Sequence, residues 1–167
     1  MTAPRRFCVC VGLLGLLALP AGATEADFGV EKQRDVARAS RELEQVPFGA
    51  EAYERRAELF RWWKEVPEIK LRWCPTLLLD VDLDHESLQG TLLLQALLSA
   101  GAFQLEQRGS VRSREIWIAG VAGALRTYRV AREELPELRN GFLDELEQLE
   151  RAGRLGEYVE SHAADCE

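Results

Sequence analysis

Apolar residues recur at intervals of three and four over most of this chain, which is the spacing of amphipathic helices. The longest such segment runs from 84 to about 107. Its leucines and alanines cover nearly the whole helix circumference, so it is predicted to be a buried central helix. Other helical segments end at Pro47, Pro67 and Pro136, because proline lacks the N–H that continues a helix. The pattern predicts an all-α, or nearly all-α, fold.

Five or six helices are expected in an antiparallel array, because the connections are short. The first two are predicted at about 31–46 and 50–66. After the central helix, another should begin near Ser110 or Ser113 and end before Pro136. Two shorter helices are predicted after Asn140, separated near Gly153.

Residues 69–83 differ from the rest of the chain. Apolar and polar residues alternate there, which is the period of a half-buried strand. Pro75 interrupts the run and is incompatible with a simple central strand. A short extended crossing is the favoured interpretation, and an irregular helical turn is the second possibility.

The first 23 residues have the pattern of a secretory signal peptide. Arg5 and Arg6 precede an apolar run at 7–19, and Ala21-Gly22-Ala23 forms a small-x-small cleavage site. The apolar run is shorter than the roughly 20 residues that a membrane span requires. We therefore expect a periplasmic or secreted protein with no stable membrane insertion after cleavage.

The mature protein is then expected to consist of a flexible leader at 24–30 and a single helical domain at 31–167. Residues 1–23 contain two of the 21 basic and none of the 28 acidic residues, so their removal changes the net charge from -7 to -9. Nucleic acids require clustered Lys and Arg, so this charge argues against them as partners. It favours a basic protein partner.

Cysteine usage agrees with export. Cys8 and Cys10 would leave with the signal peptide, so that Cys74 and Cys166 remain in an oxidising compartment. Neither is adjacent to a histidine or part of a C-x-x-C pair, as a reactive thiol would often be. A structural disulfide is predicted, with a free reactive thiol as the alternative.

An acidic cluster precedes the central helix. Asp80, Asp82 and Asp84 have the D-x-D-x-D spacing with which an EF-hand calcium loop begins. His85 and Thr91 occupy the positions of the turn glycine and the bidentate glutamate of such a loop. The favoured interpretation is a solvated segment in which Asp84 caps the helix, a metal site being the alternative; no cofactor is expected.

Glu86-Ser87, the Ser99-Ala100-Gly101-Ala102 segment and Gln104 resemble pieces of the lytic transglycosylases, which are exported helical enzymes acting on peptidoglycan. The resemblance implies that Glu86 acts as general acid and base, which requires a partly desolvated carboxyl group. The Gly-Leu-Met-Gln string of that family is absent.

A second resemblance concerns Ala124, Tyr128, Ala131 and Pro136, whose spacing is similar to the second helix of a tetratricopeptide repeat. It implies a paired first helix directly upstream. The first-helix positions hold residues that depart from the family pattern, namely Arg108, Val111, Arg112 and Glu115.

In the 50–66 helix, Trp63 is assigned to the core stripe with Tyr53, Ala57 and Phe60. Trp62 points about 100° away from Trp63, which predicts a place at the core margin. Exposed tryptophans are common anchors of protein interfaces. Trp62 is therefore the candidate binding residue.

The sequence lacks the H-E-x-x-H, G-x-S-x-G and Gly-rich phosphate-loop motifs, so it offers no recognised catalytic constellation. It favours an exported, non-catalytic binding or interaction protein of the cell envelope. Such a protein could be an adaptor, or an inhibitor or immunity-type partner of a basic protein. The alternative is a small helical peptidoglycan-active hydrolase or lyase using a carboxylate such as Glu86.

Overall fold

The computed structural model describes residues 28–66, 69–83, 85–107 and 109–166. The predicted signal peptide and most of the predicted leader lie outside these residues. Within them, Phe28 and Gly29 precede the first helix, and the Phe28 ring contacts that of Trp62 at a centroid distance of 6.4 Å.

The described residues form six α-helices and contain no β-strand, so the predicted all-α fold class is confirmed. The helices are α2 (Val30–Glu42), α3 (Ala50–Glu65), α4 (Glu86–Gln107), α5 (Ser113–Glu134), α6 (Gly141–Arg151) and α7 (Leu155–His162). Short 3-10 turns follow α2 at η1 (Leu43–Gln45), precede α4 at η2 (Pro75–Leu78) and follow α7 at η3 (Ala164–Cys166).

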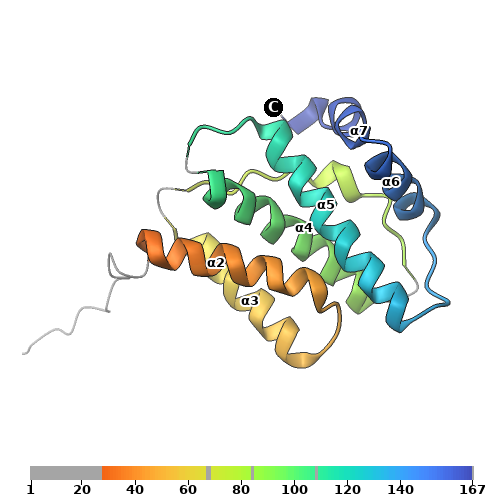
Figure 1. The fold of residues 1–167 in the computed structure, drawn as a ribbon, viewed down its shortest axis with the longest axis horizontal. Coiled ribbons are helices and arrows are strands. Elements are labelled where there is room, and N and C mark those ends of the chain that lie inside the picture. Colours follow the sequence, from red (N-terminus) through yellow and green to blue (C-terminus); the bar gives the residue numbers. More distant parts are fainter. Residues whose placement is uncertain (1–27, 67–68, 84, 108, 167) are drawn as a thin grey trace, which may run out of the picture.

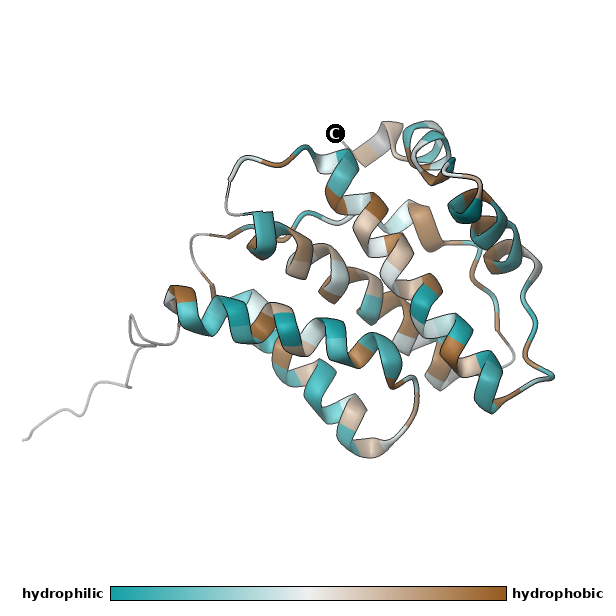
Figure 2. Ribbon diagram, viewed as in Figure 1, coloured by the Kyte–Doolittle hydropathy of each residue, from teal (hydrophilic) through white to brown (hydrophobic). Residues whose placement is uncertain are grey.

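Helix α4 lies at the centre and packs against α5, α2 and α3 (Figure 1). Two hydrophobic clusters meet at this helix. The smaller one joins α2 and α3 to Leu98, and the larger one joins Leu92 and Ala96 to α5, η2, α6 and α7. Hydrophilic residues dominate the sides of α2 and α3 that Figure 2 turns toward the reader. The predicted central position of the leucine-rich helix is confirmed.

Helix α4 is also long and apolar enough, over Ser87–Gln107, to cross a membrane by length and composition alone. Most of this segment is buried within the fold, and it carries the buried polar side chains of Gln95 and Ser99. These are properties of the core helix of a globular domain.

The buried stripe of α3 differs from the predicted one. Tyr53 is 63% exposed, whereas the buried residues are Ala52, Arg56, Leu59, Trp62 and Trp63. The predicted stripe of Tyr53, Ala57 and Phe60 is therefore rotated by about one residue from the observed one. Arg56 is buried because its guanidinium group donates hydrogen bonds to the carbonyl oxygens of Leu43 and Val46, both at 2.7 Å.

The segment 69–83 contains no strand; Pro75–Leu78 forms a 3-10 turn, and non-helical chain flanks it. This is the second of the two predicted possibilities, an irregular helical turn. Leu77 and Leu78 are buried under α7 and α4, whereas Leu79 is 69% exposed.

Helix α5 is continuous from Ser113 to Glu134, and residues 109–112 are not helical. A tetratricopeptide repeat would require a separate first helix at this point. The helix pair that the resemblance implies is therefore not present among the described residues. Ala124, Tyr128 and Ala131 are fully buried core residues of a single long helix, which accounts for their spacing.

Glycines allow α4 and α5 to approach closely. A Cβ atom on Gly120 would meet the Trp73 ring and would lie 2.8 Å from the Ala96 carbonyl oxygen. A Cβ atom on Gly123 would meet the Ser99 side chain. Gly90, which also lies within α4, has open space at this position.

Gly120→Ala is therefore expected to destabilise the protein by about 1–3 kcal/mol, because backbone or ring atoms must move to admit the methyl group. Gly90→Ala is the matched control, and it should stabilise the protein by up to about 1 kcal/mol through helix propensity. Urea unfolding followed by circular dichroism measures both. Equal effects of the two substitutions would contradict the close approach.

Candidate functional site

A buried carboxylate joins three parts of the fold. The Glu44 side chain, in η1, is 5% exposed. Its Oε2 atom accepts a hydrogen bond from Arg126 Nε of α5 at 2.6 Å. Its Oε1 atom accepts from Arg126 Nη2 at 2.8 Å, Ser99 Oγ at 2.8 Å and Arg41 Nη1 at 2.9 Å. The carboxylate thus fixes α2 and η1 to both α4 and α5.

The polar network continues into α3. Gln95 Nε2 donates to the Ser40 carbonyl oxygen at 2.8 Å and to Ser99 Oγ at 3.1 Å. Gln95 Oε1 accepts from Arg56 Nε at 3.0 Å. Burial lowers the pKa of Arg56 to about 10, because the charged form has lost its water.

The surroundings of Glu44 favour its ionised form. Burial by itself would raise the pKa of Glu44, but hydrogen bonds from Arg126 and Ser99 and the charge of Arg126 outweigh it. The pKa is therefore lowered from its ordinary value of 4.5. A general acid requires the opposite shift, so Glu44 is suited to holding helices together rather than to proton transfer.

A second buried glutamate is also bound by arginine side chains. Glu147 of α6 accepts a hydrogen bond from Arg132 Nη2 of α5 at 2.6 Å and from Arg151 Nη2 at 3.1 Å. Arg129 lies 3.8 Å from its other carboxylate oxygen. Glu147 therefore fixes α6 to α5, again through arginines.

The position of Trp62 differs from the predicted one. Trp62 is 9% exposed and Trp63 is 3% exposed, and both belong to the smaller hydrophobic cluster. Phe28 covers Trp62 from the chain before α2, while Trp63 packs on Gly101 of α4. Both tryptophans are buried although they point about 100° apart, because the chain before α2 covers Trp62 and α4 covers Trp63. The interface role assigned to Trp62 relied on an exposed indole, which the structure does not provide.

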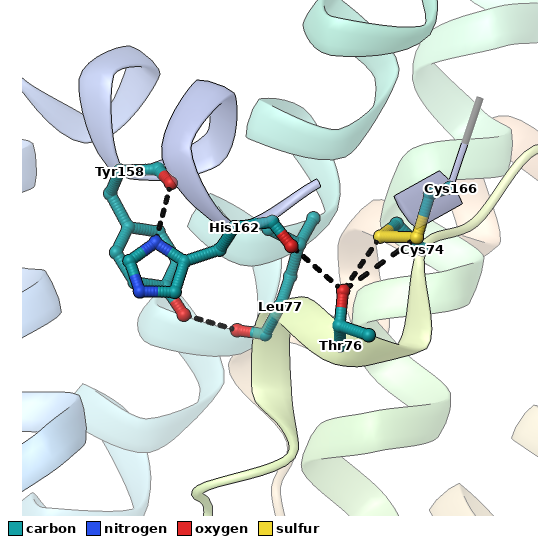
Figure 3. The surroundings of a disulfide bond; sticks show 6 residues. All are labelled: Cys74, Thr76, Leu77, Tyr158, His162 and Cys166. Atoms are coloured by element: carbon teal, nitrogen blue, oxygen red, sulfur yellow. Dashed lines mark hydrogen bonds between the residues drawn. A yellow bond between two sulfur atoms is a disulfide. The ribbon is translucent and has the colours of Figure 1, made fainter. Parts of the chain in front are cut away.

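Cys74 and Cys166 form a disulfide with a Cα–Cα distance of 5.6 Å. The bond joins the chain before η2 to the C-terminal η3 turn (Figure 3). Thr76 lies beside the sulfur atoms, and its hydroxyl donates to the His162 carbonyl oxygen at 2.9 Å. Tyr158 OH donates to the Leu77 carbonyl oxygen at 3.0 Å. The pairing predicted from the cysteine count is the one present.

The acidic cluster before α4 is solvated. Asp80 and Asp82 are exposed, and Asp84 lies outside the described residues. The part of the chain that the structure describes holds no group of three ligand side chains arranged for a metal ion. His85 directly precedes α4, and its Nδ1 atom accepts a hydrogen bond from the Leu88 amide at 3.3 Å.

Glu86 is the first residue of α4, but its side chain lies outside what the structure describes. The other residues that resemble the transglycosylases make contacts within the fold. Ser99 binds Glu44, Gly101 contacts Trp63, and Gln104 Nε2 donates to the Lys70 carbonyl oxygen at 3.2 Å. A catalytic role of Glu86 stays an untested alternative.

A surface groove lies between α2 and α3 and has a volume of about 700 Å³. We call it the acidic groove. Apolar side chains form its floor: Ala39, Leu43, Val46, Phe48 and Ala52. Four glutamates and a single arginine form its rim: Glu42, Glu51, Glu54, Glu58 and Arg55. Its size is that of a ligand or peptide site.

The net negative charge of the protein follows from its sequence, but the concentration of glutamates at the acidic groove was not predicted. Glu42 belongs to α2, whereas Glu51, Glu54 and Glu58 belong to α3. The spacing of the three α3 glutamates at intervals of three and four was a signal for one acidic helix face. No family model, no curated protein and no solved structure matches this chain.

Proposed function

We propose that this chain is an exported, non-catalytic binding protein that holds a basic, partly apolar segment of a partner protein in the acidic groove. The observation that carries the proposal is the apolar floor of the groove inside a rim with four glutamates and one arginine. An amphipathic helix with lysines or arginines beside its apolar face would complement both features.

The rim charges are available to a partner. Glu51 and Glu54 are exposed and form no ion pair with any described residue. Arg55 is paired with Glu58 at 2.9 Å and Glu42 with Arg38 at 3.9 Å, so Glu51 and Glu54 supply the unpaired negative charge of the rim. Val46 contributes an apolar side chain that is 45% exposed, and Tyr53 of α3 is 63% exposed beside Ala52 and Glu54. Exposed aromatic and aliphatic groups within a charged rim are typical of protein interfaces.

Two further observations support the proposal. One favours a binding protein over an enzyme, and the other favours an exported protein over one that stays in the cytoplasm. The two buried glutamates, Glu44 and Glu147, are each bound by arginines, which suits anchoring of helices. The disulfide suits an oxidising compartment, in agreement with the signal-like pattern at 1–23.

A labelled amphipathic peptide of leucine and lysine provides a direct test. The protein should bind this peptide more tightly than the same peptide with glutamate in place of lysine. Glu51→Lys combined with Glu54→Lys should weaken binding roughly tenfold, because two attractive contacts become repulsive. Binding should also weaken from low to physiological salt, as exposed charges are screened beyond about 8–10 Å. Fluorescence anisotropy measures each of these effects.

The matched control is Glu133→Lys combined with Glu134→Lys at the end of α5, which changes the net charge equally but lies outside the groove. This variant should bind the peptide almost as the wild type does. If both double variants weaken binding equally, the attraction is a property of net charge and the groove proposal is wrong.

The enzyme alternative has its own decisive assay. Glu86→Gln should leave peptide binding unchanged apart from a slight effect at the start of α4. Release of soluble fragments from purified peptidoglycan by the wild type, lost in Glu86→Gln, would overturn the binding proposal.

A further inference from the structure

A second hollow, of about 770 Å³, lies along the first half of α2. We call it the basic hollow. Its other walls are the chain at 69–72, the end of α4 and the chain at 109–111 that leads to α5. Its volume lies within the range of about 300–1,000 Å³ that small-molecule sites occupy.

The charge of the basic hollow is opposite to that of the rest of the protein. Its described lining includes Arg34, Arg38 and Arg72 and one carboxylate, that of Glu106; Arg38 is paired with Asp35 at 2.7 Å, which leaves Arg34 and Arg72 as the charges open to a ligand. Glu106 is already bound by Arg41, at 2.9 Å and 3.1 Å. Arg34 forms no ion pair with any described residue. A positive hollow in a chain of net charge -7 favours a negatively charged ligand.

The body of the basic hollow is apolar. Accessible aliphatic side chains from four segments line it: Val30, Ile69, Leu105 and Val111. An inorganic anion or a nucleic-acid phosphate would leave these groups without a partner. An anion that carries a hydrocarbon body would cover them and release the water on them.

Hydrogen bonds fix the wall that carries Arg72. The Gln104 side chain accepts from the Arg72 amide nitrogen at 3.2 Å and donates to the Lys70 carbonyl oxygen at 3.2 Å. Arg72 Nη1 donates to Ser113 Oγ at 3.3 Å, which directs the guanidinium group toward the start of α5. A wall fixed before binding lowers the entropy cost of taking up a ligand.

We infer that the basic hollow binds a small carboxylate with an apolar body, of the medium-chain fatty-acid type. The carboxylate lies between Arg34 and Arg72, and the hydrocarbon chain covers Ile69, Leu105 and Val111. A guanidinium group can bind a carboxylate through two parallel hydrogen bonds, which suits this head group. The site is separate from the acidic groove and does not depend on it.

Isothermal titration calorimetry with dodecanoate below its micelle concentration tests the inference on the purified protein. One molecule of dodecanoate should bind per protein, and dodecyltrimethylammonium, with the same chain and the opposite charge, should not. Arg34→Gln combined with Arg72→Gln should weaken dodecanoate binding roughly tenfold. Both arginines are exposed, so the fold should be retained, as circular dichroism will show.

The matched control is Arg55→Gln combined with Arg139→Gln, which removes two exposed arginines outside the hollow and should leave dodecanoate binding unchanged. Val111→Glu, which places a negative charge in the apolar wall, should abolish binding. The inference is overturned if dodecanoate does not bind at millimolar concentration, if the cationic amphiphile binds equally well, or if the Arg34 and Arg72 variant binds as the wild type does.

Discussion

Glu44→Gln is expected to lower the free energy of unfolding by about 2–4 kcal/mol. Removing one partner of a buried ion pair typically costs about 3–5 kcal/mol, because the other charge remains buried without compensation. The lower part of this range applies here because the side chains of Arg126 and Arg41 are 32% and 27% exposed and can partly rehydrate. Urea denaturation at pH 7, followed by circular dichroism, gives the value.

Glu42→Gln is the matched control, since Glu42 precedes Glu44 by two residues but its side chain is 69% exposed. Exposed ion pairs contribute about 0–1 kcal/mol, so this variant should remain close to the wild type. Combining Glu44→Gln with Arg126→Met should cost less than the sum of the single changes, because the two groups interact directly. Additive effects would show that the carboxylate and the guanidinium group do not stabilise one another.

The pH dependence of the Glu44 contribution follows from the direction of its shift. The pKa of Glu44 is lower in the folded protein than in the unfolded chain, so the unfolded state takes up the proton first as the pH falls. The stabilisation by Glu44 is therefore complete above the unfolded value and is lost as the pH falls toward the folded value. The difference in stability between wild type and Glu44→Gln should shrink below about pH 5.

The helices were predictable because their determinants are local. The periodic apolar residues of α2, α4 and α5, and the prolines after α2 and α5, place these helices within a few residues of their observed bounds. The pairing of Cys74 with Cys166 was also predictable, because removal of the signal-like segment leaves a single possible pair.

The buried charges were not predictable from local pattern. Charged residues are rarely buried unless they are paired, so nothing in the local sequence marks Glu44 or Arg56 as a buried residue. Their partners lie far away in the sequence: Arg126 is 82 residues from Glu44, and Gln95 is 39 residues from Arg56. Only the packing of α2, α3, α4 and α5 brings these groups together.

The two candidate sites were missed for a related reason. Composition reports the sum of the charges, whereas function depends on where the charges lie. The acidic groove and the basic hollow share α2, which contributes Glu42 to the first and Arg34 and Arg38 to the second. Their opposite charges largely cancel in the net charge, so neither could be deduced from it.

Loss of the disulfide is expected to have the largest effect on stability. Cys74 and Cys166 are 92 residues apart, and in the chain-entropy model a cross-link closing such a loop stabilises the fold by about 4–5 kcal/mol. Cys166→Ser is the better variant, because Cys166 is only partly buried whereas Cys74 is fully buried. The Thr76 to His162 and Tyr158 to Leu77 hydrogen bonds remain and should keep α7 in place in the folded state.

Those hydrogen bonds do not restrain the unfolded chain, which should expand when the cross-link is lost. Cys166→Ser should therefore show a steeper dependence of the unfolding free energy on urea concentration together with the lower stability. A reductant should give the wild type the stability of Cys166→Ser while leaving the variant unchanged. A wild type whose stability does not respond to reductant, or in which Cys74 and Cys166 both titrate as free thiols under denaturing, non-reducing conditions, would contradict a stabilising bond at this position.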